Sequence, residues 1–360
     1  MNVTIIGAGN TGFAKAAHLA QTGENVTMWN ICPDEIAKLM ETHTLHTEGI
    51  ITGDAKLDLV TTDMKEALKS PDVILITTPA FTHKGLAEDI AKNIEKEALI
   101  VLFPGRTFGA LEFYETFKLY NQDFLPLVAE SQTAVYTCRK TGDDSVDIIS
   151  IKNDVLISAI DSNDTAEVIR RLPDALSPHF TAADSMVQTS IGNVGMIFHC
   201  APILLNAGWT ENEKYSYMYY HDGITPSVGK LLEKIDQERI NVSKAMGLEV
   251  ESAKQWLNRV YDSTGETLYD TIQNTEPYET IEAPNSLFYR YVTEDIPNGL
   301  VPLESAGKHL VLDMKHTSMI IDLATALVEK DFRATGRNLG NIFDESNNEF
   351  ETIFNRGENE

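Results

Sequence analysis

Three glycines, Gly7, Gly9 and Gly12, follow a short apolar run at the start of the chain, and a helical pattern begins directly after them. In this arrangement the first glycine permits a tight turn, the second lets the backbone approach a pyrophosphate, and the third lets the helix pack close to its strand. Free N–H groups and the dipole at the helix start favour an anion there. The spacing therefore predicts a dinucleotide-binding βαβ unit, with Asn10 beside the phosphates.

Further segments are expected to line the dinucleotide. The second strand ends at Asn30, where an acidic residue would accept from the ribose 2′-OH of NAD and an arginine would favour NADP. Asn30 can bond a hydroxyl without repelling a phosphate, and no arginine stands beside it, so NAD and NADP both remain open; Asn30 could also be a plain turn residue. Pro79, Ala80 and Pro104 follow two later strands at the carboxyl edge of the sheet, although the prolines could merely end those strands.

One histidine, His199, lies in a strongly apolar helical pattern just before Pro202. An imidazole can accept and donate protons near neutral pH, but a buried histidine can also serve only the core. Asn193, six residues earlier, is expected on a partly shared face of the same helix. It could reach the same site or cap an interhelical contact. His221, followed by Asp222, is a rival histidine in a segment expected to form a loop.

A second polar cluster surrounds Arg290, which stands between two tyrosines and precedes Glu294 and Asp295. A planar guanidinium binds a carboxylate through two parallel hydrogen bonds, so Arg290 is a candidate for holding an anionic substrate. The alternative is a surface ion pair between Arg290 and Glu294, which are four residues apart on a helix.

Composition sets the class of protein. The 360 residues suffice for two domains, and 42% hydrophobic with 23% charged residues is ordinary for a globular chain. A formal net charge of −25 disfavours nucleic acid and anionic membranes as partners. The chain shows no leader pattern and no apolar stretch of membrane-spanning length, and its three cysteines are few and widely spaced. A cytoplasmic enzyme is expected.

Metal chemistry is not expected. His43, His46 and Cys32 are the residues that could be considered as ligands, and their spacing matches no common metal site.

Strand and helix signals alternate in the first half, with near-continuous apolar runs at 73–76 and 98–103, which predicts a doubly wound α/β domain over residues 1–185. Two β-rich runs at 148–151 and 155–157 predict a hairpin that extends the sheet. Long helical patterns then predict an all-α domain over 186–343, with helices at 186–206, 227–246, 250–261 and 303–329. Residues 344–360 form an acidic tail. The cleft between the domains is the expected substrate site.

These residues point to a family resemblance that spans nearly the whole chain. The chain resembles the opine dehydrogenases, the octopine/nopaline dehydrogenase group. The motifs that carry the resemblance are Gly7–Gly12, Phe103–Gly105 with Gly109–Phe113, Glu130–Ser131 with Tyr136–Arg139, His199–Pro202 with Leu204–Gly208, Gly223–Val228, Thr293–Asp295, Gly299–Leu303 and Asp331–Arg337. The motifs of the helical half are more specific than the glycine turn.

The resemblance implies NAD(P)H-dependent reductive condensation of an amino acid amine with a 2-oxo acid, and the reverse oxidation. It implies a catalytic His199 paired with Asp295, and Arg290 as the residue that holds a substrate carboxylate. Asn193 and Thr225 are the other candidate substrate-binding residues. The expected partners are these small molecules, with a homodimer as the candidate assembly. The identities of the amino acid and the oxo acid, and the choice of NAD or NADP, stay open.

Two alternatives compete with this interpretation. A ketopantoate-reductase-like enzyme would reduce a 2-oxo acid to a hydroxy acid with a lysine as the acid, but residues 183–194 contain no lysine. A nonenzymatic protein could instead sense dinucleotide occupancy, which would not require His199, Asp295 and Arg290.

Overall fold

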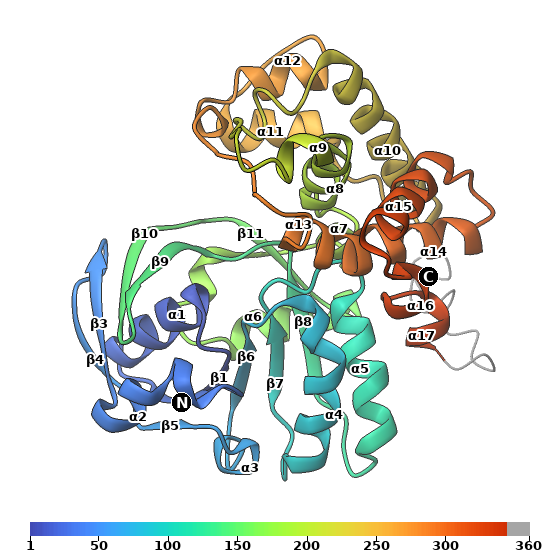
Figure 1. Cartoon of the computed structure of the whole chain (residues 1–360). Coiled ribbons are helices and arrows are strands. Elements are labelled where there is room, and N and C mark those ends of the chain that lie inside the picture. Colours follow the sequence, from blue (N-terminus) through green and yellow to red (C-terminus); the bar gives the residue numbers. More distant parts are fainter. Residues whose placement is uncertain (344–360) are drawn as a thin grey trace. The chain divides into compact units, whose positions relative to one another are not determined.

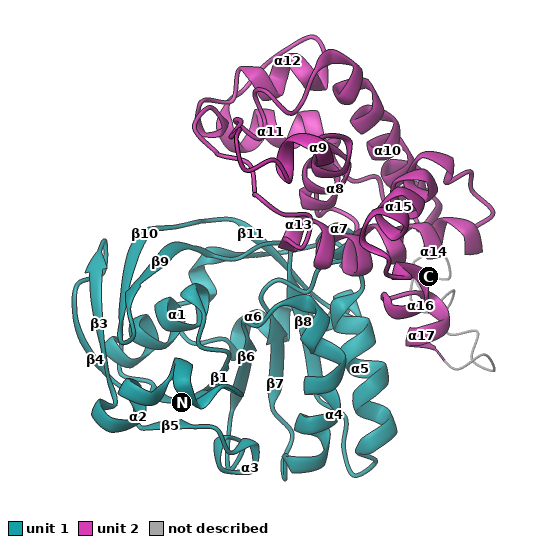
Figure 2. Cartoon of the chain, viewed as in Figure 1, with its two compact units in different colours: residues 1–190 teal, residues 191–360 magenta. Residues whose placement is uncertain are grey.

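The computed structural model describes residues 1–343. It divides into two compact units, residues 1–190 and 191–360, drawn in teal and magenta in Figure 2. The first unit contains the predicted α/β layers and the second is built of helices. The acidic tail expected at 344–360 lies outside the described residues.

The first unit is built on an eight-stranded sheet with the strand order β12-β11-β8-β7-β6-β1-β2-β5 (Figure 1). The six strands from β8 to β5 are parallel, and β11 runs antiparallel to β8. The strands are β1 (Asn2–Ile6), β2 (Asn25–Trp29), β5 (Leu59–Thr61), β6 (Val73–Ile76), β7 (Leu99–Leu102), β8 (Leu127–Ser131), β11 (Val155–Ala159) and β12 (Phe180–Ala182).

The order of strands creates a switch point at β1. β2 lies on one side of β1 and β6 on the other, so the connections that follow β1 and β6 lead to opposite sides of the sheet. In open α/β sheets, ligands bind in the crevice at such a point. Every residue of β6 and β7 is buried, as the apolar runs predict for strands that are covered on both faces. The flanking helices are α1 (Asn10–Gln21), α3 (Met64–Ala67), α4 (His83–Asn93), α5 (Gly109–Tyr120) and α6 (Thr165–Arg171).

A second, four-stranded sheet has the order β4-β3-β10-β9 and was not expected from the sequence. Its strands are β3 (Thr44–Gly49), β4 (Gly53–Lys56), β9 (Tyr136–Gly142) and β10 (Ser145–Ile151). The predicted hairpin between the runs at 148–151 and 155–157 is wrong. β10 pairs with β9 and β3, whereas β11 pairs with β8 and β12 in the main sheet. Strand propensity identifies both runs but does not specify their partners.

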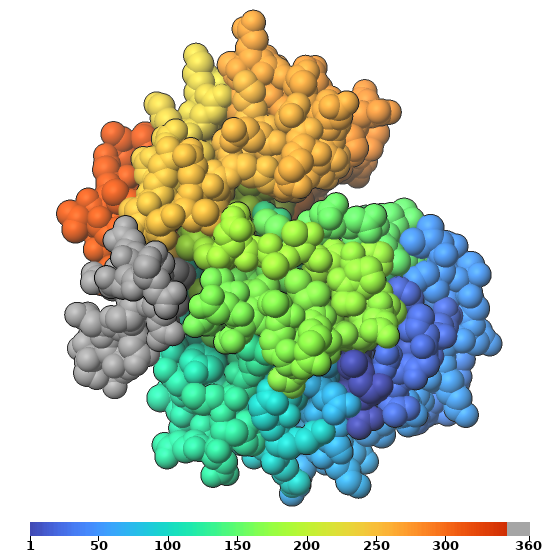
Figure 3. Space-filling model, turned by 180° about the vertical axis from the view of Figure 1, so that it is seen from behind, coloured from blue at the N-terminus to red at the C-terminus, as the bar shows by residue number. Residues whose placement is uncertain are grey.

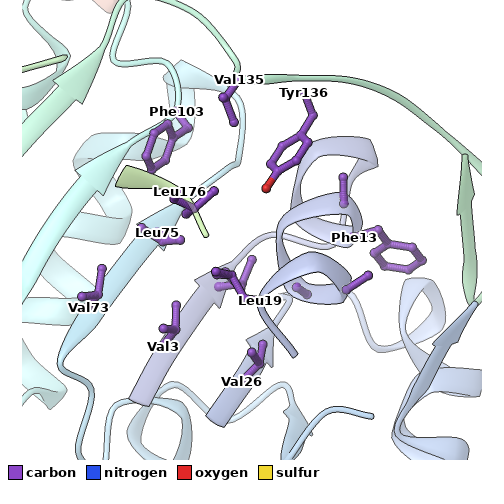
Figure 4. Close-up of a cluster of buried hydrophobic side chains, with 14 of the residues drawn as sticks. Val3, Phe13, Leu19, Val26, Val73, Leu75, Phe103, Val135, Tyr136 and Leu176 are labelled. Carbon is purple, nitrogen blue, oxygen red and sulfur yellow. The ribbon is translucent and has the colours of Figure 1, made fainter. Parts of the chain in front are cut away.

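Helix α1 packs against strands of both sheets and is therefore buried on nearly every side. This explains its composition, because alanine and glycine allow both layers to approach its backbone. Figure 4 shows Phe13 and Leu19 of α1 in one cluster with Val3, Leu75 and Phe103 of the main sheet region. Tyr136, from β9, closes the same cluster on the side of the second sheet, along with the neighbouring Val135.

The reverse face of the first unit is formed by the last part of its chain. Helix α6 packs on β11 and β12, and the segment that contains it is yellow-green in the space-filling view (Figure 3). Helix α6 spans Thr165–Arg171. It does not end the unit, because β12 and α7 (Met186–Ser190) still follow.

The second unit contains α8 (Gly195–Leu205), α9 (Ala207–Thr210), α10 (Pro226–Ala245), α11 (Ala253–Tyr261), α12 (Leu268–Gln273), α13 (Arg290–Thr293), the π-helical segment η6 (Ile296–Leu300), α14 (Val301–His309), α15 (Lys315–Val328), α16 (Phe332–Thr335) and α17 (Leu339–Ile342). Two predicted helices are interrupted. The one at 186–206 breaks at Ile191–Val194 into α7 and α8, and the one at 303–329 breaks into α14 and α15. The predictions for α10 and α11 are confirmed within about three residues.

Helix α10 is the centre of the second unit and contacts α8, α12, α14 and α15. Its Arg239 is fully buried and donates to the Asp236 carboxylate at 2.8 Å and to the carbonyls of Ile191 and Glu251 at 2.8 and 2.7 Å. A buried charge is tolerated when its donors are satisfied in this way. Arg239 thereby anchors the start of the second unit to its central helix. Within the described residues no helix is long and apolar enough to cross a membrane.

Candidate active site

The glycine turn of the first unit has the geometry that each glycine predicts. Gly7 adopts φ +106°, and a Cβ there would lie 2.7 Å from Thr78 Cγ2. A Cβ on Gly12 would lie 2.0 Å from the Gly7 carbonyl oxygen, so only glycine allows α1 to pack this closely. A Cβ on Gly9 would meet nothing within 4 Å. The space over Gly9 is therefore open, as the approach of a pyrophosphate requires.

The start of α1 provides donors beside that open space. No side chain caps the helix, so its first N–H groups can serve an anion. The loops after β1 and β6 are tied together, because Thr77 Oγ1 donates to the carbonyls of Ile6 and Gly7 at 3.0 and 3.1 Å. These residues fit a dinucleotide at the switch point of the sheet.

Lys140, a residue of the second sheet, reaches this region and escaped the sequence prediction. Its N–H, in β9, donates to Asn10 Oδ1 at 2.8 Å, and its amine donates to the Ala8 carbonyl at 3.2 Å. The amine also lies 3.8 Å from the centre of the Phe13 ring. Burial lowers the pKa of Lys140, and the Glu35 carboxylate opposes that shift. Only the packing of β9 against α1 reveals this contact, since Asn10 and Lys140 are 130 residues apart.

Asn30 is buried, and its side chain is fully engaged. Its Nδ2 donates to Glu35 Oε2 at 2.9 Å and to the Cys32 carbonyl at 3.2 Å, while its Oδ1 accepts from the Ala8 N–H at 3.4 Å. Asn30 thus links the end of β2 to the glycine turn and holds the Glu35 carboxylate at that edge.

The remaining predicted cofactor residues lie after β6 and β7. Pro79 precedes a short 3-10 turn, η2 (Ala80–Thr82), and its carbonyl accepts from Thr82 Oγ1 at 2.8 Å. Ala80 is buried. Pro104 follows β7 through a cis peptide bond. Pro79 and Pro104 lie in the loops that follow the neighbouring strands β6 and β7 at the carboxyl edge of the sheet.

In the second unit, His199 and Asp295 lie together although they are 96 residues apart in the sequence. His199 Nδ1 and Asp295 Oδ2 are 2.8 Å apart. The side chain of Asp295 is 1% exposed and that of His199 is 19% exposed. A carboxylate at Nδ1 fixes the orientation and tautomer of an imidazole, which leaves Nε2 as the edge that meets a substrate.

The local sequence explains why His199 and Asp295 can come so close together. A Cβ on Gly299 would lie 2.9 Å from Met196 Cβ, so glycine allows η6 to pack against α8. His199 lies one helical turn after Met196 on α8, and Asp295 directly precedes η6. Single π-helical turns occur frequently at functional sites. The Gly299–Leu303 motif therefore contains the glycine that lets these segments approach each other.

Two tyrosines complete the surroundings of His199, and neither was predicted. The ring of Tyr291, on α13, stacks on the imidazole with centroids 4.0 Å apart and planes inclined by 13°. The buried Tyr219 hydroxyl donates to the backbone carbonyl of His199 at 2.5 Å. Burial raises the pKa of Tyr219 well above its usual value and that of Tyr291 to about 12. Both hydroxyls are therefore neutral at physiological pH.

Arg290 begins α13 and is half exposed. Its Nη2 lies 3.3 Å from Glu294 Oε2, so the ion pair that stood as the alternative is present. Glu294 is buried, whereas the Arg290 side chain stays half exposed. Arg290 directly precedes Tyr291 and lies on the helix that leads to Asp295, which keeps it close to the His199 site.

Asn193 is not where it was expected, and the other candidates are engaged with the backbone. Asn193 does not share a helix with His199, because it lies in the break before α8, where its Oδ1 accepts from the Gly195 N–H at 2.9 Å. Thr225 caps α10 through its hydroxyl, which accepts from the Val228 N–H at 3.4 Å. Asp222 accepts from the Met218 N–H at 2.8 Å, an engagement with the backbone of its own loop.

Comparisons with known proteins identify the family of the chain. Residues 182–328 match the family model of the α-helical domain of NAD/NADP octopine/nopaline dehydrogenase, and residues 2–105 match that of the N-terminus of NAD-dependent glycerol-3-phosphate dehydrogenase. The opine dehydrogenase of Arthrobacter sp. (strain 1C) is 35% identical over 338 residues, which cover 93% of each chain.

Solved structures share the fold. The structure of octopine dehydrogenase with NADH and L-arginine has a TM-score of 0.77 at 19% identity and covers 95% of this chain and 94% of its own. Yersinopine dehydrogenase with NADP+ bound has a TM-score of 0.79 at 14% identity, with 98% and 97% covered. With the 35% identical relative matching over nearly its whole length, the chain belongs to the opine dehydrogenase family and is an NAD(P)-dependent oxidoreductase that acts on CH–NH donors.

Proposed function

We propose that His199 and Asp295 form the proton-transfer unit of this enzyme and that Arg290 holds a substrate carboxylate. The reaction is the NAD(P)H-dependent reductive condensation of an amino acid with a 2-oxo acid. The observation that carries the proposal is the 2.8 Å contact between His199 Nδ1 and the buried Asp295 carboxylate.

The reaction needs protons to move twice before reduction. The amine attacks the 2-oxo carbon only after losing its ammonium proton, and the resulting hydroxyl leaves as water only after gaining a proton. His199 Nε2 can accept the first proton and return one to the departing hydroxyl, while Asp295 keeps Nδ1 protonated. Bound NAD(P)H supplies the hydride that reduces the iminium to a secondary amine.

Anion recognition is divided between backbone and side chain. The open space over Gly9 and the uncapped start of α1 suit the pyrophosphate of NAD(P). For the substrate carboxylate, Arg290 offers a fork-shaped donor that its partner Glu294 occupies through one nitrogen. Asn193 and Thr225 remain proposed substrate contacts, and each is anchored to the backbone near its own helix start.

The proposal also covers the roles of the two domains, the compartment and the assembly. Residues 1–185 serve the cofactor and 186–343 serve the substrate and the proton transfers. The enzyme works in the cytoplasm, for which the three widely spaced free cysteines are the support. A homodimer is the proposed assembly.

A two-part assay tests the proposed function. NADH or NADPH oxidation is followed with pyruvate and a panel of amino acids, and the product is identified by mass spectrometry. We expect oxidation only when both substrates are present, with a product whose mass is that of the amine plus the oxo acid, less water, plus two hydrogens. His199→Ala should abolish it.

The same assay separates the competing functions. A ketopantoate-reductase-like enzyme would oxidise the cofactor with the 2-oxo acid alone and release a hydroxy acid. A dinucleotide sensor would bind the cofactor without turnover. Either result would contradict the proposal.

A further inference from the structure

We propose that Tyr291 is a positioning residue for His199, holding the imidazole in plane through its ring. The inference rests on the proposed role of His199. It starts from the near-parallel stack of the two rings, with 4.0 Å between centroids and 13° between planes.

The stack supplies a support that Asp295 cannot. A hydrogen bond at Nδ1 fixes the imidazole in its plane but still allows the ring to rotate about the N···O axis. An aromatic face against the imidazole opposes this rotation. Tyr219 fixes the backbone of His199 through its hydroxyl, and its ring lies 5.0 Å from that of Tyr291. Backbone, ring edge and ring face of His199 are thus each held by a different residue.

The stack and the Nδ1 contact both act on the orientation of the imidazole. An aromatic face also attracts a positive charge that lies over it. The charged or titratable groups that face this pair are Asp295, Arg290, Tyr219, Tyr220 and Tyr289.

The ring, rather than the hydroxyl, should carry the effect. Burial raises the pKa of Tyr291 to about 12, so its hydroxyl does not supply a proton at neutral pH. Tyr291→Phe keeps the stack and loses the hydroxyl, whereas Tyr291→Leu keeps an apolar side chain and loses the stack. The two variants therefore separate the two parts of the residue.

Tyr278 offers a matched control. It stacks on Tyr220 with centroids 4.0 Å apart and planes inclined by 15°, and it is buried in the same aromatic group. Tyr278→Leu removes an equivalent stack that does not include His199. A loss of stability caused by the smaller side chain would appear in both leucine variants. A loss of the contact with His199 would appear only in Tyr291→Leu.

The first measurement is the NMR shift of the His199 ring protons, assigned by comparison with His199→Gln. We expect an upfield ring-current shift in the wild type, Tyr291→Phe and Tyr278→Leu, and its loss in Tyr291→Leu.

The second measurement is the steady-state kinetics of the reductive condensation. Tyr291→Leu should lower kcat by about 3- to 30-fold with both substrate KM values within about twofold. Tyr291→Phe should restore kcat.

Failure of this inference can be told from failure of the proposed function. If His199→Gln is inactive but Tyr291→Leu keeps wild-type kcat, or if Tyr291→Phe is as slow as Tyr291→Leu, the positioning role of the ring is overturned. If His199→Gln keeps full activity, the proposed function fails, and the inference with it. An equal loss of kcat in Tyr278→Leu and Tyr291→Leu would also overturn it, because a general packing effect would then account for both.

Discussion

At the scale of single residues, the glycine turn of the cofactor site depends on positions that have no side chain. Gly9 leaves open the space that a phosphate needs. Gly7 and Gly12 have no room for a side chain, because a Cβ on either would lie only 2.7 or 2.0 Å from the nearest protein atom. Substitution of Gly9 therefore tests ligand binding, while substitution of the other two would test folding.

We expect Gly9→Val to fold normally and to bind NAD(P)H much more weakly. Gly9 has an extended backbone, φ −78° and ψ −174°, which a valine adopts without strain. Its side chain would occupy the space for the pyrophosphate. Fluorescence titration with NADH and NADPH measures the affinity, and Gly85→Val, at another glycine with open surroundings, is the control. Unchanged affinity in Gly9→Val would remove the glycine turn from the cofactor site.

For Arg290 the prediction concerns geometry rather than charge. Arg290→Lys keeps the positive charge but loses the two-pronged donor, so kcat/KM for the carboxylated substrate should fall by about one to two decades, equivalent to roughly 1.5–3 kcal/mol. NAD(P)H affinity should not change. Arg259→Lys is a matched control, since Arg259 is equally exposed and also pairs with a glutamate. Wild-type kcat/KM in Arg290→Lys would refute the assignment.

At the scale of secondary-structure elements, helix α1 has to satisfy two sheets at once. Its Lys15 is fully buried, and its amine has no hydrogen-bond partner among the described residues. The amine lies 4.2 Å from the centre of the Phe103 ring and 5.3 Å from that of Tyr136, so aromatic faces are its main stabilising contacts. Burial lowers the pKa of Lys15 to about 7, and Cys138 and Lys152 exert opposing smaller effects.

This burial predicts how stability depends on pH. Between pH 7 and about 10.5 the unfolded chain binds a proton at Lys15 that the folded chain does not, so the free energy of unfolding should rise with pH across this window. Below pH 7 the cost of burying the ammonium is present in full. Lys15→Met should therefore stabilise the protein at pH 6 by on the order of a few kcal/mol.

Urea unfolding at a series of pH values checks this expectation. The difference in unfolding free energy between Lys15→Met and the wild type should shrink as the pH rises from about 7 to about 10. Lys65→Met, at an exposed lysine of the same unit, should show no such trend. A difference that stays constant over this range would show that Lys15 does not titrate on folding there.

Elements and residues differ in how well the sequence predicts them. The buried parallel strands β6 and β7 and the long helix α10 follow from local patterns, because their periodicity reports burial directly. The second sheet does not, since β3 and β10 are joined across about a hundred residues. The stack of Tyr291 on His199 was not predicted either, because the two residues are far apart in the sequence. The motif around Asp295, by contrast, pointed to the carboxylate that contacts His199 in the structure.

At the scale of the whole molecule, a chain with a net charge of −25 has to bind an anionic cofactor and carboxylated substrates. Long-range electrostatics oppose this, so local donors must provide the attraction. In the first unit these are backbone N–H groups at the start of α1, and in the second the candidate is the guanidinium of Arg290. The reaction also requires proton transfer, and in the proposed mechanism His199 and Asp295 carry it out together.

The most direct test of the proposed mechanism is a double-mutant cycle on kcat for the reductive condensation, using wild type, His199→Ala, Asp295→Asn and the double variant. Residues that act as one unit are non-additive. We predict that each single variant loses most of the activity and that the double variant is little slower than His199→Ala alone. Losses that multiply in the double variant would show that the two residues act independently, which would contradict the central claim.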